Sequence, residues 1–207
     1  PARKMYSGAG RAGGASKNNK YDGELGFIRG RGEQSLCFYG RGRSASRVGA
    51  CRSASLLATF DGACKGNPGS TGQGSVLFDC EGAPLRERLG SAGKTTNNVS
   101  EYKALCNTLE LALEEAGEGA NLLILGDSSL CVMQVCGQWN VTTDHLLPYR
   151  RRCHELMQKF DHIALCHVKR EFNAYADAVA NDSVSTSEVA THDRDPTQPL
   201  ERLPPPG

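Results

Sequence analysis

The sequence predicts an α/β fold: a five-stranded mixed sheet, with three antiparallel strands followed by two parallel strands, flanked by helices. Two observations lead to this prediction. Short apolar segments separated by turn-forming residues come first, which is the pattern of an antiparallel meander. A segment with helical periodicity follows, and apolar runs then alternate with helical segments, as in sheets that gain parallel strands through helical connections. We expect this domain to occupy residues 58–187, a length that suits one independently stable core.

The first three strands are expected within residues 55–91. Residues 55–63 (SLLATFDGA) are short and apolar, and the turn formers of GNPGSTGQG follow them and reverse the chain. Residues 75–79 (SVLFD) and 84–91 (PLRERLGS) supply the next two strands, the second with leucines separated by charges. A hairpin followed by a third antiparallel strand is the simplest arrangement of these segments.

The hydrophobic period changes after Lys94. Apolar side chains then recur every three or four residues from Tyr102 to Ala116, which makes one face of a helix. Asn98 is the expected N-cap of this helix, and Gly117 is expected to end it.

The remaining elements alternate between strand and helix. Residues 121–127 (NLLILGD) form an uninterrupted apolar run, typical of a strand buried on both faces. We then expect a short helix over 128–136, a longer one over 144–160, a fifth strand over 163–168 and a last helix capped by Asn173. Because two strands are parallel additions, strand ends and helix starts meet at one edge of the sheet, where the sites of such sheets usually lie.

Charge divides the chain into two parts. Lys and Arg number 24 against 23 Asp and Glu, a net charge of +1. Residues 1–58 hold 11 basic and 3 acidic side chains, a net of +8, so the rest carries −7. Residues 1–57 contain 11 of the 24 glycines and show no apolar periodicity, so we expect a disordered basic arm. The proline-rich residues 188–207 are expected to form a disordered tail.

Three functions of the arm stay open: gripping phosphates through the RG repeats at residues 30–32 and 40–43, linking domains, or acting as an organelle presequence. No apolar stretch approaches the roughly 20 residues of a membrane span, so we expect no membrane association. Nine cysteines without a CxxC pair indicate an intracellular reducing compartment. We expect this to be the cytoplasm or nucleus, or an organelle if the arm is a presequence.

Four acids stand at boundaries between a buried element and a turn: Asp61, Glu101, Asp127 and Asp177. Each has a simple structural explanation when taken alone. Glu101 follows Asn98 by three residues and could complete a capping box, and the others could cap helices, bind turn amides or favour a helix dipole.

Together the four acids indicate a metal site, because the predicted topology brings them to one edge of the sheet. Carboxylates that are brought together repel one another, and bound cations make the arrangement favourable at neutral pH. Mg²⁺ prefers oxygen ligands and keeps positions for water and substrate phosphates. Two such ions would suit phosphoryl transfer, with one activating a water and the other stabilising the leaving oxygen.

Four segments around these acids resemble type 1 ribonuclease H. They read TFDGACKGNPGSTGQGSVLFD, TTNNVSEYKALCNTLELAL, LLILGDSSLCVMQVCGQW and HVKREFNAYADAVAND, in the family's order, and span residues 59–182. The resemblance implies the ribonuclease H-like fold and endonucleolytic hydrolysis of the RNA strand of RNA–DNA hybrids. It also implies two Mg²⁺ ions, which Mn²⁺ could replace. We expect the catalytic domain to be monomeric.

The resemblance assigns roles to individual residues. Asp61 would bridge both ions, Asp127 and Asp177 would complete one site each, and Glu101 would add a ligand near the RNA 2′-hydroxyl. The nucleic-acid-binding residues that it implies are, for the RNA strand, Gly62, Cys64 and Asn67, and, for a DNA phosphate, Thr96, Asn97 and Asn98. Trp139, the only tryptophan, would face the DNA strand or lie in the core, and both alternatives stay open.

The sequence departs from the family's bacterial pattern. The segment VKREFNAYAD, residues 168–177, is short and has no histidine, which resembles the archaeal and plant-like branch and leaves proton handling unassigned. Arg170 could steer phosphate or form a salt bridge. Two other functions remain as alternatives: a nucleic-acid-binding module whose catalysis has decayed, and the ribonuclease H part of a retroelement polyprotein.

Overall fold

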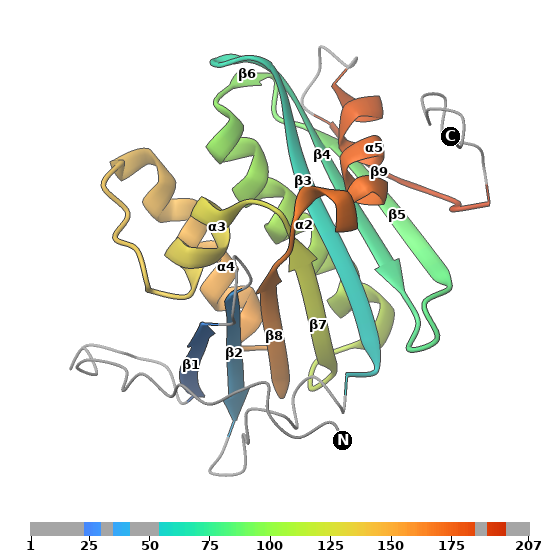
Figure 1. Ribbon diagram of the computed structural model, residues 1–207. Coiled ribbons are helices and arrows are strands. Elements are labelled where there is room, and N and C mark those ends of the chain that lie inside the picture. Colours follow the sequence, from blue (N-terminus) through green and yellow to red (C-terminus); the bar gives the residue numbers. More distant parts are fainter. Residues whose placement is uncertain (1–22, 30–34, 42–53, 185–189, 198–207) are drawn as a thin grey trace.

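The computed structural model describes residues 23–29, 35–41, 54–184 and 190–197, and it describes side chains over residues 54–184 and 191–197. Its centre is a mixed sheet with helices on both faces (Figure 1). The strands follow one another across the sheet in the order β1-β2-β8-β7-β3-β4-β5-β9, and the two-residue strand β6 pairs with β4. Within the described residues, no helix is both long enough and apolar enough to cross a bilayer.

The five predicted strands form the middle of this sheet, which confirms the predicted fold class. Strands β3, β4 and β5 are antiparallel neighbours, β7 lies parallel to β3, and β8 lies parallel to β7. Their bounds are Leu56–Gly66 (β3), Gly69–Phe78 (β4), Pro84–Ser91 (β5), Asn121–Gly126 (β7) and His162–His167 (β8). Strand β6 is Lys94–Thr95.

The first hairpin turns more tightly than expected, because most of the run GNPGSTGQG belongs to β4 rather than to a loop. Its glycines permit close packing of a helix. A Cβ atom at Gly72 would lie 2.1 Å from the Ala180 carbonyl oxygen, and one at Gly74 would lie 2.4 Å from the Ala176 carbonyl oxygen. Gly72 and Gly74 therefore allow the backbones of β4 and α5 to approach closely, which is a role beyond turn formation.

Helices cover both faces of the sheet. Helix α5 lies on one face over β4, and α2, α3 and α4 lie on the other (Figure 1). Their bounds are Asn97–Ala116 (α2), Ser129–Val135 (α3), Leu147–Met157 (α4) and Ala174–Ser183 (α5), and the short 3₁₀ turns Asp144–Leu146 and Arg170–Phe172 precede α4 and α5. The expected helix over 144–160 is therefore a 3₁₀ turn followed by a shorter α-helix.

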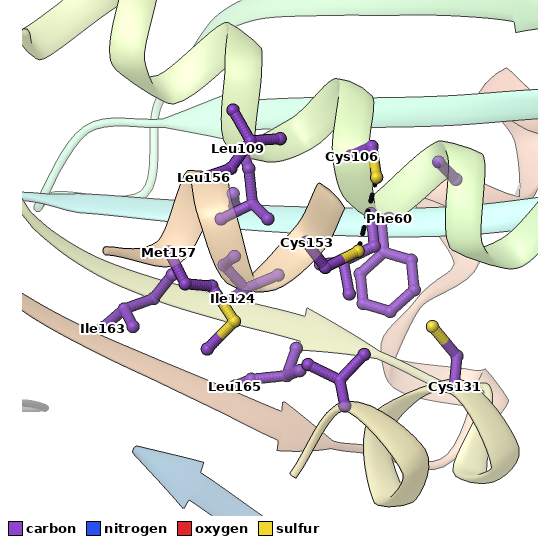
Figure 2. Packing of buried hydrophobic residues seen from close by; sticks show 14 of the residues in the cluster. Phe60, Cys106, Leu109, Ile124, Cys131, Cys153, Leu156, Met157, Ile163 and Leu165 are labelled. Atoms are coloured by element: carbon purple, nitrogen blue, oxygen red, sulfur yellow. Dashed lines mark hydrogen bonds between the residues drawn. The ribbon is translucent and has the colours of Figure 1, made fainter. Parts of the chain in front are cut away.

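The larger hydrophobic core lies between the sheet and helices α2, α3 and α4. Phe60, Ile124 and Leu165 come from three adjacent strands and meet Leu109 and Leu156 from the helices (Figure 2). A smaller cluster on the opposite face joins Val76 and Leu89 to Val179 of α5. The periodic apolar residues of the sequence are the ones that fill these two layers.

Helix α2 begins two residues earlier than expected. Thr96 is its N-cap, and the Thr96 hydroxyl accepts a hydrogen bond from the Val99 amide at 3.4 Å. Asn98 is therefore inside the helix, and its prediction as the N-cap is wrong. The error arose because Thr and Asn are comparable capping residues, and residues 95–98 (TTNN) place two of each in a row.

Three further strands lie in segments that we expected to be disordered. Gly23–Arg29 (β1) and Ser35–Arg41 (β2) form an antiparallel hairpin, and β2 pairs antiparallel with β8. Ala190–Arg194 (β9) pairs antiparallel with β5. The expectation of disorder for residues 1–57 and 188–207 is wrong for these segments, and the repeat at residues 30–32 lies outside the described residues. Edge strands gain main-chain hydrogen bonds from the sheet and need no apolar alternation of their own.

Ion pairs hold β9 against the sheet. The Arg194 guanidinium pairs with Glu87, whose side chain is fully buried, and reaches Asp182 at 3.4 Å. The neighbouring Asp193 pairs with Arg88, with 2.6 Å between Oδ1 and Nε. The Tyr175 hydroxyl also donates a hydrogen bond to Glu87. These charges, which look like surface residues in the sequence, explain why a polar segment forms an ordered strand.

Candidate active site

The four acids come together at one edge of the sheet, as the topology predicts. Phe60 of β3 is paired with Gly126 of β7, so that Asp61 and Asp127 follow at neighbouring positions. Helix α2 presents Glu101, and the first turn of α5 presents Asp177. Asp61 and Glu101 are buried, with 5% and 6% of their surface exposed. Asp127 and Asp177 are half-buried, so the cluster opens to solvent on their side.

Gly62 allows α2 to approach this edge. A Cβ atom at Gly62 would lie 2.4 Å from the Glu101 amide nitrogen and 2.6 Å from the Ser100 carbonyl carbon, so only glycine fits here without moving the helix. The Gly62 main-chain amide in turn donates to the Glu101 carboxylate. Gly62 therefore positions Glu101, a role that is separate from any contact with a substrate.

Glu101 does not complete a capping box, because the N-cap is Thr96 and not Asn98. Its carboxylate receives hydrogen bonds from Gly62 and from the Asn97 side chain. The Oε2 atom is nevertheless buried and has no hydrogen-bond partner. A buried acceptor without a partner is unfavourable, so this oxygen marks a place where the folded protein lacks a hydrogen-bond donor or a cation.

The pKa values of two of the four carboxylates are raised by burial and by their neighbours, which indicates an excess of negative charge in the cluster. Burial, followed by repulsion from Asp127 and then Asp177, raises the pKa of Asp61 from 3.8 to about 8. Burial, followed by repulsion from Asp61 and Asp127, raises the pKa of Glu101 well above its usual value. Both shifts have the sign expected when carboxylates share a site without enough cations.

Arg170 supplies part of the missing positive charge. Its guanidinium pairs with the Asp177 carboxylate and attracts Asp61 and Asp127 over a longer distance. Of the two roles that the sequence left open for Arg170, the structure shows the salt bridge. The Arg170 side chain is 74% exposed, so it can leave Asp177 at small cost.

Asn173 was missed as a site residue. We expected it to cap α5, but its side chain makes no capping hydrogen bond. Its buried Nδ2 atom instead donates to the Phe60 carbonyl oxygen at 2.8 Å and to Asp127 Oδ1 at 2.7 Å. The signal in the sequence was only its position four residues before Asp177, and that position fits capping equally well.

The residues expected to bind nucleic acid surround the first hairpin and the start of α2. The Asn97 amide donates to Asn67 Oδ1 at 3.2 Å, which ties the turn to the helix. The Cys64 thiol donates to the Gly66 carbonyl oxygen at 2.5 Å. Asn67 is exposed, and Thr96, Asn97 and Asn98 are half-buried. Polar groups at a helix start are thus accessible beside the acids.

Trp139 follows α3 and is 46% exposed. Its amide donates to the Met133 carbonyl oxygen at 3.1 Å, which fixes the backbone at the end of α3. A tryptophan that exposes nearly half of its surface is not a core residue, so the core alternative is wrong.

The donor set fits a hard divalent cation. In the arrangement described over residues 54–184 and 190–197, no three His, Cys, Asp or Glu side chains are placed to hold a metal ion. The chemistry of the site nevertheless favours one: the ligands are all carboxylate oxygens, Glu101 Oε2 lacks a partner, and Asp61 and Glu101 resist ionisation. Oxygen-rich sites with excess negative charge are those that Mg²⁺ and Mn²⁺ occupy.

Comparison with known proteins agrees with this geometry. Residues 59–183, which contain all four acids, match the family described as reverse transcriptase-like. Ribonuclease HI of Halobacterium salinarum is 38% identical over 133 residues, which are 64% of this chain and 66% of that protein. A bifunctional protein of Mycobacterium tuberculosis is 35% identical over 67% of this chain but only 38% of its own length. The chain thus spans less than two thirds of these relatives.

Solved structures show the same relationship. The crystal structure of RNase H1 from Halobacterium salinarum is 37% identical, with a TM-score of 0.59 over 62% of this chain and 96% of that one. The structure of LC11-RNase H1 in complex with an RNA/DNA hybrid is 31% identical, with a TM-score of 0.59 over 62% of this chain and 96% of that one. From the matched residues, the shared fold and these relatives, the chain belongs to the ribonuclease H family.

Proposed function

We propose that this chain hydrolyses the RNA strand of RNA–DNA hybrids with divalent cations held by Asp61, Glu101, Asp127 and Asp177. The observation that carries the proposal is the uncompensated negative charge of these four acids, seen in the raised pKa of Asp61 and the unpartnered Glu101 oxygen. The relatives named as ribonucleases H and the hybrid-bound structure of one of them support the same activity.

Each acid has a role in this proposal. Asp61 would contact two ions, Asp127 and Asp177 would each contact one, and Glu101 would add a ligand near the RNA 2′-hydroxyl. Two bound Mg²⁺ ions would lower the pKa of the attacking water and stabilise the leaving oxygen, and Mn²⁺ could replace them. Asn173 holds the Asp127 carboxylate in place through its 2.7 Å hydrogen bond. Arg170 would give up its contact with Asp177 when cations are present.

Substrate selection would depend on the groups around the acids. Gly62, Cys64 and Asn67 lie on the hairpin next to Asp61 and would contact the RNA strand, whose 2′-hydroxyl distinguishes it from DNA. Thr96, Asn97 and Asn98 at the start of α2 suit a DNA phosphate, because main-chain amides and short polar side chains bind anions there. The exposed Trp139 offers a surface for stacking or for contact with the sugar.

Cleavage assays on three labelled substrates test this proposal: an RNA–DNA hybrid, double-stranded RNA and double-stranded DNA. We expect cleavage of the hybrid's RNA strand with Mg²⁺ or Mn²⁺ and none with EDTA. Asp127→Asn should lower the rate about 100-fold or more. Glu118→Gln, a change at an exposed acid paired with Lys159, serves as the matched control and should cleave normally.

Two results would contradict the proposal. Equal cleavage by the wild type and Asp127→Asn would indicate a contaminating nuclease. Binding of the hybrid without cleavage at any Mg²⁺ or Mn²⁺ concentration would instead support a decayed nucleic-acid-binding module.

A further inference from the structure

Two cysteines from different helices meet in the hydrophobic core. Cys106 of α2 and Cys153 of α4 place their sulfur atoms 3.3 Å apart, as the dashed line in Figure 2 shows. Both side chains are buried, and both thiols are reduced in the structure. A sulfur–sulfur separation this short leaves little movement before a covalent bond could form.

The two thiols differ in their access to small solutes. Cys106 lines a pocket of about 250 Å³ together with Lys103, Tyr149 and Arg152, whereas Cys153 does not line it. Cys106 is 8% exposed and Cys153 is 0% exposed. A small molecule that enters this pocket therefore reaches Cys106 first, with Cys153 directly behind it.

The pocket in front of Cys106 carries a net positive charge. The Arg152 guanidinium lies within electrostatic reach of the Cys106 sulfur, and Lys103 lines the same pocket. Glu110 also lines the pocket and pairs with Arg152 at 2.7 Å, so Lys103, Arg152 and Glu110 together leave one positive charge beside the pocket. Burial raises the pKa of the Cys153 thiol well above its usual value, so Cys153 is the less reactive partner.

We propose that Cys106 and Cys153 form a peroxide-sensitive thiol pair that closes into a disulfide between α2 and α4. Hydrogen peroxide oxidises the Cys106 thiol to a sulfenic acid and is itself reduced to water. The Cys153 sulfur then attacks the Cys106 sulfur, the sulfenic hydroxyl leaves with the Cys153 proton as a second water, and the disulfide forms. This modification site is independent of the proposed hydrolase activity.

The cross-link would join parts of the domain that are 47 residues apart in the chain. A closed loop of this length restricts the unfolded chain, so the oxidised protein should unfold at a higher temperature, by about 5 to 15 °C. The bond would also fix α4 to the helix that carries Glu101, five residues before Cys106.

The test treats the full chain with hydrogen peroxide, blocks the remaining thiols under denaturing conditions and maps peptides without reduction. We expect a peptide pair joined through Cys106 and Cys153, absent after treatment with dithiothreitol, and a thermal midpoint that rises on oxidation and falls on reduction. Cys153→Ser should instead stop at a Cys106 sulfenic acid, trapped by dimedone.

The exposed Cys80 provides the internal control, because it should react with peroxide regardless of the pair. Oxidation of Cys80 with both Cys106 and Cys153 still free would overturn the proposal. A disulfide from Cys106 to Cys131, the third buried thiol in Figure 2, would overturn it as well. Both readouts use the wild-type protein, so they remain decisive if a serine variant fails to fold.

Discussion

Raising the pH of the metal-free protein is expected to lower its free energy of unfolding, because the folded state resists ionisation of Asp61. In the unfolded chain Asp61 loses its proton near pH 3.8, and in the folded protein it does so near pH 8. Between these values the folded state holds the additional proton. Stability therefore falls as the pH rises through this interval, and the penalty is fully present above about pH 8.

The magnitude follows from the pKa interval. Each change of one in pKa corresponds to about 1.4 kcal/mol, so the interval from 3.8 to about 8 corresponds to on the order of 6 kcal/mol for Asp61. His154 acts in the opposite direction, because burial lowers its pKa from 6.5 and the folded state gains stability as the pH rises toward 6.5. His154 is present in both proteins, so its contribution cancels when the unfolding free energies of Asp61→Asn are subtracted from those of the wild type at each pH.

Urea unfolding in EDTA, followed from about pH 5 to pH 9, measures this difference. Asp61→Asn should equal the wild type at low pH and become the more stable protein by several kcal/mol at high pH. The control Glu118→Gln, at an exposed acid, should follow the wild type throughout. Added Mg²⁺ should restore wild-type stability at high pH, because a ligand that binds only the folded state stabilises it.

A difference between the wild type and Asp61→Asn that stays constant from pH 5 to pH 9 would refute the reasoning. The reasoning would also be refuted if Mg²⁺ stabilised Asp61→Asn as much as it stabilises the wild type.

Three other substitutions test particular contacts. Asn173→Ala removes the hydrogen bonds to Phe60 and Asp127, so it should lower the free energy of unfolding by about 2–4 kcal/mol and slow hybrid cleavage. Asn107→Ala, which loses one hydrogen bond to Gln73, is its control and should leave the cleavage rate unchanged; equal rates for both variants would show that Asn173 does not position Asp127. Arg194→Ala leaves the buried Glu87 charge unpaired and should cost about 3–5 kcal/mol in urea unfolding, and a loss below 1 kcal/mol would contradict the burial of this pair. Gly62→Ala should abolish cleavage and lower the thermal midpoint, because its Cβ would overlap the α2 backbone; normal cleavage would argue against this close approach.

The central part of the fold could be predicted because its signals are local. Apolar runs such as residues 121–126 and the three-to-four-residue period of α2 are visible in a short window of sequence. The four acids could be predicted for a related reason: each follows the apolar run of a strand or lies near the start of a helix, and the topology brings such positions to one edge of the sheet.

The rest depends on contacts between distant residues. Strand β9 forms because Arg194 and Asp193 meet charges more than 100 positions away, at Glu87 and Arg88. Asn173 reaches Phe60, 113 positions away, and nothing near Asn173 in the sequence indicates that partner. The capping residue of α2 was missed for a different reason, since several equally good caps stand side by side.

Strands from both ends of the chain cover the two sides of the five-stranded core, and this arrangement bears on where the domain can be cut. Without residues 23–41, strand β8 would present a row of unpaired amides and carbonyls, and without residues 190–194 strand β5 would do the same. Exposed edges of this kind pair readily with other chains. A fragment limited to residues 58–187 would keep every acid of the site but would end its sheet in β8 and β5, where the longer chain ends in β1 and β9, so we expect the fragment to self-associate more readily.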